Sequence, residues 1–126
     1  MGNLSANFDI EEWQCSCPCK SRDISMDLVN KVQTVRHVFD RPMRITSGVR
    51  CSDFNASIGA SPSSSHVPLN GRPSLAVDLF VGNSADRFRL LQLALHDFSR
   101  VGVSKEPGFI HLDIDEEKSQ RVLWLY

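Results

Sequence analysis

Residues 65–78 read Ser65-His66-Val67-Pro68-Leu69-Asn70-Gly71-Arg72-Pro73-Ser74-Leu75-Ala76-Val77-Asp78, and the rest of the chain is organised around them. The stretch begins with His66 in a loop rich in Ser, Pro and Gly, and it ends with Asp78 inside a run of alternating apolar residues. His111 lies in a second short apolar run over 109–114. Two histidines and an aspartate on separate elements predict a three-ligand metal site with one open coordination position.

The composition is that of an ordinary globular domain. The chain has 126 residues, of which 41% are hydrophobic and 23% charged, and its formal net charge is −1. This length suits one core, so we expect a single domain over 1–126 whose segment 1–24 is anchored by Phe8, Ile10 and Trp13. The charge indicates no nucleic-acid partner, and no apolar run reaches the roughly 20 residues that cross a bilayer. We expect a monomer without a membrane partner.

Periodicity predicts two main helices and about four short strands. The first helix begins at the N-cap Ser25 and ends before Pro42, and the second is capped by Ser84 and ends before Gly102. Alternation and turn residues predict strands at 43–47, 75–81, 109–114 and 121–126, with a short helix at 52–58. Because the helices are grouped rather than alternating with the strands, we expect an α+β fold with a small antiparallel sheet packed against two helices.

Strand periodicity also assigns faces to the candidate site residues. Asp78 lies opposite the apolar face of its strand, and His111 shares a face with Asp113. A buried carboxylate without a partner is costly, so Asp78 is expected to be paired or bound to a cation. The remaining polar residues suggest ordinary surface: His37 and His96 lie on helices, and 115–118 is expected to be a solvated turn.

Four cysteines stand apart from this pattern. Cys15, Cys17 and Cys19 are separated by single residues, and Cys51 follows much later. Structural zinc sites usually contain two separated pairs of cysteines, which this spacing does not match. Reduced cysteines, disulfides in an oxidising compartment, and a metal site remain open, in that order of preference.

Several short motifs together resemble a known superfamily. They are Thr-Ser-Gly-Val-Arg at 46–50, Asn55, Ser-His at 65–66 followed by Gly71, Ala-Val-Asp at 76–78, and Gly-Phe-Ile-His-Leu-Asp at 108–113. In this order they resemble the zinc D-Ala-D-Ala carboxypeptidase and L-alanyl-D-glutamate endopeptidase superfamily, which shares its fold with the hedgehog signalling domain. The cysteine cluster is similar to that of small phage-type members. The resemblance covers nearly the whole chain and implies a hedgehog-type fold.

The resemblance also implies a set of site residues. His66, Asp78 and His111 would bind one Zn²⁺, whose water acquires a pKa near about 7 and attacks an amide carbonyl. Arg50 resembles the family arginine that holds a substrate oxygen, although it could instead pair with Asp53 on the surface. Two serines, Ser47 and Ser65, fit hydrogen bonds that orient the ligands or bind the substrate.

Two departures from the family pattern concern the loop and the catalytic base. The gap between His66 and Asp78 is longer than usual, and the loop residues 68–73 are expected to absorb it. Where many members carry an acid three residues before the last histidine, this chain has Gly108. Two candidates replace it: Asp113, as base or ligand-orienting carboxylate on the strand face of His111, and Glu106 on a Glu-Pro-Gly turn.

The expected function is that of a zinc-dependent peptidase that hydrolyses an amide bond in peptidoglycan stem peptides. Either the D,D-carboxypeptidase or the L-Ala-D-Glu endopeptidase type fits, in a protein encoded by a phage or prophage. The N-terminus shows no signal peptide, so we expect cytoplasmic synthesis and action on the cell wall after phage-type release or within a virion. The alternative is a non-catalytic zinc-binding module that recognises cell wall or builds a phage tail.

Overall fold

Two long helices supply much of the apolar core in the computed structural model, which describes residues 2–126. Helix α1 (Met26–Phe39) begins after Ser25, whose side chain accepts a hydrogen bond from the backbone of Leu28, as predicted. Helix α3 (Ser84–Asp97) begins one residue earlier than predicted, because Asn83 rather than Ser84 is its N-cap. Asn and Ser cap helices about equally well, so local sequence could not choose between them.

The strands form one five-stranded sheet in the order β1-β2-β4-β3-β5. Their bounds are β1 Ile45–Ser47, β2 Ala76–Phe80, β3 Arg100–Ser104, β4 Phe109–Asp113 and β5 Val122–Leu125. Neighbouring strands are antiparallel except β3 and β5, which are parallel. The predicted α+β class is confirmed, and β3 is the strand that the sequence did not predict.

Gly102 explains why β3 was missed. In the sequence it resembled a residue that ends a helix, but it lies in the middle of β3. A Cβ atom on Gly102 would lie 2.6 Å from the ring of Trp124 on β5. Glycine is therefore needed here for the close approach of a side chain rather than for a helix end.

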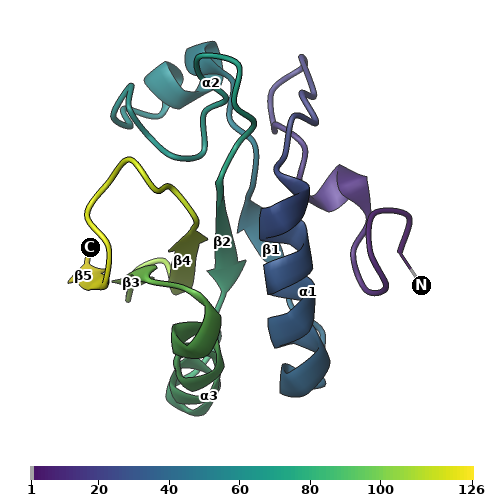
Figure 1. Ribbon diagram of the computed structural model, residues 1–126, viewed down its shortest axis with the longest axis vertical. Coiled ribbons are helices and arrows are strands. Elements are labelled where there is room, and N and C mark those ends of the chain that lie inside the picture. The colour runs from purple at the N-terminus through teal and green to yellow at the C-terminus, as the bar shows by residue number, and fades with distance from the viewer. Residues whose placement is uncertain (1) are drawn as a thin grey trace.

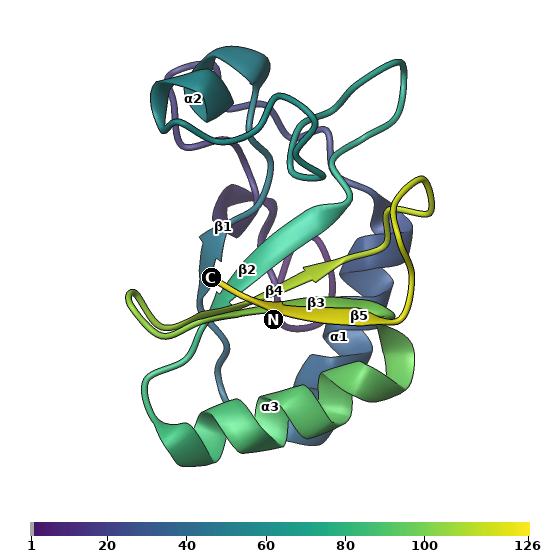
Figure 2. The ribbon, with the colours of Figure 1, turned by 90° about the vertical axis from the view of Figure 1, so that its left-hand side faces the viewer.

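The sheet separates a helical layer from a loop layer (Figures 1 and 2). In Figure 2, α3 lies below the sheet, whereas the short helix α2 (Ser52–Ser57) and the loop before β2 lie above it. The core between sheet and helices contains Leu28, Val32, Val35, Val77, Leu79, Leu90, Ala94, Ile110 and Leu112. Among residues 2–126, none of the helices combines the length and apolar character needed to cross a lipid bilayer.

The N-terminal segment is anchored beside α1. Phe8 and Trp13 are both buried and pack edge to face, with ring centroids 5.6 Å apart, and they flank the 3-10 helix η1 (Ile10–Glu12). The carbonyl of Trp13 accepts a hydrogen bond from the backbone of Val49 at 2.8 Å. The predicted anchors Phe8 and Trp13 are confirmed, and Ile10 is half-buried. This contact ties the start of the chain to the segment that follows β1.

The extra loop residues form a tight turn. Leu69 and Arg72 make an isolated antiparallel bridge, and between them Asn70 and Gly71 have φ of 52° and 82°. Positive φ at both central residues is what a type I′ turn requires, and Asn-Gly is its preferred sequence. The insertion therefore folds on itself, as expected of a loop that absorbs added length.

Candidate metal centre

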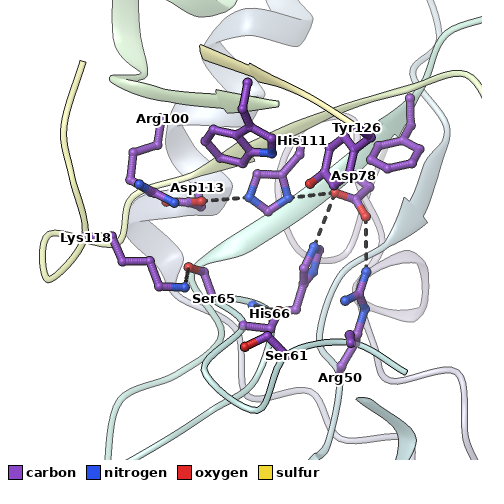
Figure 3. A pocket seen from close by; sticks show the side chains of 14 residues that line it. Arg50, Ser61, Ser65, His66, Asp78, Arg100, His111, Asp113, Lys118 and Tyr126 are labelled. Carbon is purple, nitrogen blue, oxygen red and sulfur yellow. Dashed lines mark hydrogen bonds and ion pairs between the residues drawn. The ribbon is translucent and has the colours of Figure 1, made fainter. Parts of the chain in front are cut away.

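Three buried side chains converge from a loop and two central strands (Figure 3). Strands β2 and β4 pair so that Asp78 lies directly opposite His111. His66 reaches them from the loop before β2, and its carbonyl accepts a hydrogen bond from the backbone of Arg50 at 3.0 Å. One potential ligand atom from each of His66, Asp78 and His111 lies within 4.8 Å of the others. The structure thus brings together the three predicted metal ligands.

In each histidine, the ring nitrogen that does not face Asp78, here called the outer nitrogen, is held by a hydrogen bond. His66 donates from Nδ1 to the carbonyl of Gly48 at 2.7 Å, and His111 donates from Nε2 to Asp113 Oδ2 at 2.7 Å. The inner nitrogens, His66 Nε2 and His111 Nδ1, lie 3.3 Å and 2.9 Å from Asp78 Oδ1. A hydrogen bond at one ring nitrogen sets the tautomer and leaves the other nitrogen to bind a cation.

The pKa values follow from burial and from these hydrogen bonds. Burial opposes the ionisation of Asp78, but hydrogen bonds with His111 and His66 outweigh it and hold the pKa of this carboxyl well below its usual range. Burial lowers the pKa of His66. For His111 burial acts in the same direction, but hydrogen bonds with Asp113 and Asp78 outweigh it and raise the pKa. A cation at the centre would therefore replace a proton held by His111.

Asp113 faces the outer side of His111 rather than the centre. Its Oδ2 binds His111 Nε2, and its Oδ1 accepts hydrogen bonds from Arg100 Nε at 2.7 Å and from the backbone of Asp115 at 3.1 Å. The side chain is fully buried, and the hydrogen bond with His111 lowers its pKa despite that burial. Of the two roles predicted for Asp113, this geometry fits the ligand-orienting carboxylate.

The β3–β4 turn keeps Glu106 away from the centre. Glu106 is exposed and lines a separate cavity with Asn83 and Arg87. The neighbouring Gly108 accepts a hydrogen bond through its carbonyl from the backbone of Val81 at 3.1 Å. A Cβ atom on Gly108 would lie 2.5 Å from the Val81 carbonyl oxygen, so an acidic side chain does not fit there without moving the turn. This close approach explains the departure from the family pattern at Gly108.

Arg50 points into the site and not toward Asp53. Its Nε donates to Ser47 Oγ at 3.0 Å, and its Nη2 lies 3.3 Å from Asp78 Oδ2. Its Nη1 is 3.5 Å from Asn55 Oδ1. Ser47 and Asn55 thus hold the guanidinium in place beside the predicted metal ligand Asp78.

Ser65 is placed beside the centre by an ion pair that the sequence did not predict. Its hydroxyl donates to Asp115 Oδ2 at 2.7 Å and accepts from Lys118 Nζ at 2.9 Å. Asp115 is only 2% exposed, so the predicted solvated turn is wrong at this residue. A run of charges in a single sequence resembles a solvated turn, and only the fold shows that Asp115 joins the His66 loop to the end of β4.

The three candidate ligands line a cavity of about 340 Å³. The lining residues that were not predicted as site residues include Arg100, Lys118, Trp124 and Tyr126. The ring of Trp124 lies 5.3 Å from that of His111, and Tyr126 packs 5.1 Å from Phe109. Trp124 and Tyr126 are two residues apart, and that spacing could have indicated one common face of the last strand. Both His37 and His96 are exposed, as expected.

A comparison with protein families agrees with this geometry, although no curated protein matches the chain. The sequence profile described as peptidase M15 matches residues 6–113, a span that includes His66, Asp78 and His111 as well as the cysteine cluster. Because the match covers most of the chain, this protein belongs to the peptidase M15 family.

Proposed function

We propose that this protein is a zinc-dependent peptidase that hydrolyses an amide bond in peptidoglycan stem peptides. The observation that carries the proposal is the pair of histidine rings whose outer nitrogens are hydrogen-bonded and whose inner nitrogens face Asp78. Two imidazoles and one carboxylate suit Zn²⁺, and three protein ligands leave a position open toward the cavity. A bound zinc ion would polarise the scissile carbonyl and lower the pKa of its water to about 7.

The residues around the ligands have distinct tasks in this proposal. Asp113 holds the proton on His111 Nε2, which keeps Nδ1 free for the cation. Arg50 binds a carboxylate or carbonyl oxygen of the substrate, because its planar guanidinium is already oriented by Ser47. Burial raises the pKa of Tyr126, so its hydroxyl stays protonated at neutral pH and can donate a hydrogen bond to the substrate.

The charges in the cavity support a peptide that carries carboxylates. Arg50, Arg100 and Lys118 line it, together with the aromatic rings of Trp124 and Tyr126. Stem peptides present a carboxylate near the bond cleaved in both the D,D-carboxypeptidase and the L-Ala-D-Glu endopeptidase type. The resemblance to small phage-type members supports a phage or prophage origin, with action on the wall after release or within a virion. We expect the protein to act as a monomer.

One observation favours a second function. Among residues 2–126, the carboxylates that line the cavity are Asp78, a predicted ligand, and Asp113, which faces the outer side of His111. A metal site without a free base also fits a zinc-binding module that recognises cell wall, or a structural module of a phage tail. Membership of the peptidase M15 family favours the enzyme.

Turnover on purified peptidoglycan separates the two functions. Mass spectrometry of the soluble products should show cleaved stem peptides with the zinc-loaded wild type, and Arg50→Ala should reduce their yield. The masses also identify the bond. If a protein shown to hold zinc at this site releases no peptide at any pH, yet sediments with peptidoglycan, the recognition module replaces the enzyme.

A further inference from the structure

We infer that the four cysteines form a second metal site, a closed tetrathiolate site for Zn²⁺. Cys15, Cys17 and Cys19 lie in the loop after η1, and Cys51 precedes α2. Figure 1 shows the segment after η1 running to the end of the molecule where α2 lies. The four sulfur atoms all lie within 4.8 Å of one another.

The distances between the sulfurs describe one cluster and not two pairs. Cys17 Sγ lies 3.5 Å from Cys15 Sγ, 3.0 Å from Cys19 Sγ and 3.5 Å from Cys51 Sγ. Sulfurs bound to one tetrahedral zinc at about 2.3 Å are about 3.8 Å apart. All four cysteines are free, and two disulfides would divide them into pairs about 2.0 Å apart. Four sulfurs that all lie within 4.8 Å of one another can instead share one tetrahedral cation.

Backbone amides point at three of the sulfurs. The N–H groups of Cys19, Cys51 and Phe54 donate to the sulfurs of Cys17, Cys15 and Cys51 respectively, each at 3.4 Å. Hydrogen bonds to anionic acceptors are stronger than those to neutral ones, so these donors favour thiolates over thiols. Cys15 is fully buried whereas Cys19 is exposed. The cluster is thus closed on its inner side and accessible to an ion on its outer side.

The chemistry of the ligand set selects the metal and the role. A tetrahedral set of four thiolates is typical of Zn²⁺ or of iron–sulfur chemistry, and zinc needs no redox partner. Binding balances as one Zn²⁺ plus four thiols giving a tetrathiolate complex of charge −2 and four protons released to the buffer. Four protein ligands leave no position for water, so this site is structural.

The cysteine site would brace the first site. Trp13 lies shortly before the cysteine loop and hydrogen-bonds Val49, while Cys51 directly follows Arg50. Directly before Val49, the carbonyl of Gly48 holds the ring of His66. A cation that joins the loop at 15–19 to Cys51 therefore clamps both sides of the segment that positions His66 and Arg50.

Cobalt spectroscopy tests this site independently of peptidase activity. In His66→Ala, which lacks one ligand of the first site, the full chain is reduced, freed of metal and titrated with Co²⁺ under anaerobic conditions. Sulfur-to-cobalt charge-transfer bands should saturate at one Co²⁺ per chain and disappear on addition of Zn²⁺. The variant that also carries Cys17→Ser and Cys19→Ser should lose these bands.

The titration of the His66→Ala chain decides the matter even if the cysteine variant does not fold. Absence of charge-transfer bands, or iron rather than zinc in the isolated protein, would overturn the assignment. A protein mass that shows two disulfides would also overturn the assignment. The same holds if a thiol-alkylating reagent modifies the four thiols equally fast with and without Zn²⁺. If the His66→Ala chain shows the cobalt–sulfur bands while the zinc-loaded wild type fails to cleave peptidoglycan, this inference stands and the proposed function falls.

Discussion

The cleft of His66, Asp78 and His111 and the cluster of four cysteines both contact the segment 47–51, but they are built differently. The cleft takes two of its three ligands from the paired strands β2 and β4, whose backbone hydrogen bonds hold Asp78 opposite His111. The cluster takes three of its ligands from a loop without strands or helices and the fourth from the N-cap of α2. A cation bound by the first set would keep a position open to the cavity, whereas the second set offers four ligands and would leave none.

This difference predicts different consequences of metal loss. Because the sheet positions Asp78 and His111 without help from a cation, removal of metal from the cleft should affect chemistry more than fold. The cysteine loop has no such scaffold, so removal of metal there should affect stability first. Four experiments test this contrast.

The largest effect is expected from His66→Ala. The change removes one ligand of the cleft, and the loss of zinc forfeits several kcal/mol of transition-state stabilisation. We therefore expect kcat/KM on peptidoglycan fragments to fall about a thousandfold or more. The cobalt–sulfur bands of the cysteine site should be unchanged. Absence of the bands in this variant would overturn the cysteine site and, with it, this contrast.

Asp113→Asn should have the next largest effect. The amide keeps the size of the side chain but removes the charge that holds the proton on His111 Nε2, and loss of such a partner costs about 10- to 100-fold in metal affinity or activity. Glu106→Gln is the matched control, because Glu106 is exposed and outside the cleft, and it should change activity less than about twofold. Equal losses in both variants would contradict the roles assigned here.

The pH dependence of metal binding in the cleft reports on His111. In the metal-free protein the pKa of His111 is raised above its usual 6.5, so its proton stabilises the fold below about pH 6.5 and that contribution is lost as pH rises through the raised pKa. Because a cation must displace this proton, zinc affinity should increase with pH and fall up to about tenfold per unit below that pKa. The zinc affinity of the cleft is measured by competition with a chelating dye. The double variant Cys17→Ser/Cys19→Ser is used, so that the cysteine cluster does not compete for the metal. A flat profile from about pH 6 to 8 argues against a proton on His111.

Cys51→Ser should give the smallest effect on catalysis and a clear effect on stability. We expect a fall in Tm of about 5 °C or more, because a stability change of 1 kcal/mol moves the Tm of a domain of this size by several degrees. Activity should fall less than about tenfold, through loosening of Arg50 and of the Gly48 carbonyl that holds His66. Wild type titrated with Zn²⁺ is the reference, since its Tm should rise further with metal than that of the variant, which keeps only the cleft site. An unchanged Tm in Cys51→Ser counts against a structural metal.

Local sequence predicted what depends on near neighbours. The spacing of apolar residues predicted α1 and α3, and strand alternation placed Asp78, His111 and Asp113 on the faces where the structure has them. The long gap after His66 was predicted to be absorbed by a loop, and Asn70-Gly71 turns it. These features were accessible because helix and strand periods, caps and tight turns involve residues close in sequence.

Only the tertiary structure decided the features that depend on distant contacts. The carbonyl of Val81 explains why position 108 is glycine, and the ring of Trp124 explains Gly102. Asp115 is buried because Ser65 reaches it across the fold, and the cysteine cluster exists because Cys51 meets a loop far earlier in the chain. The sequence by itself thus determined α1, α3 and the faces of β2 and β4, and it indicated His66, Asp78 and His111 as the candidate ligands of the cleft. The tertiary structure decided which nitrogen of each histidine faces inward and whether the four sulfurs meet, because both depend on partners distant in sequence.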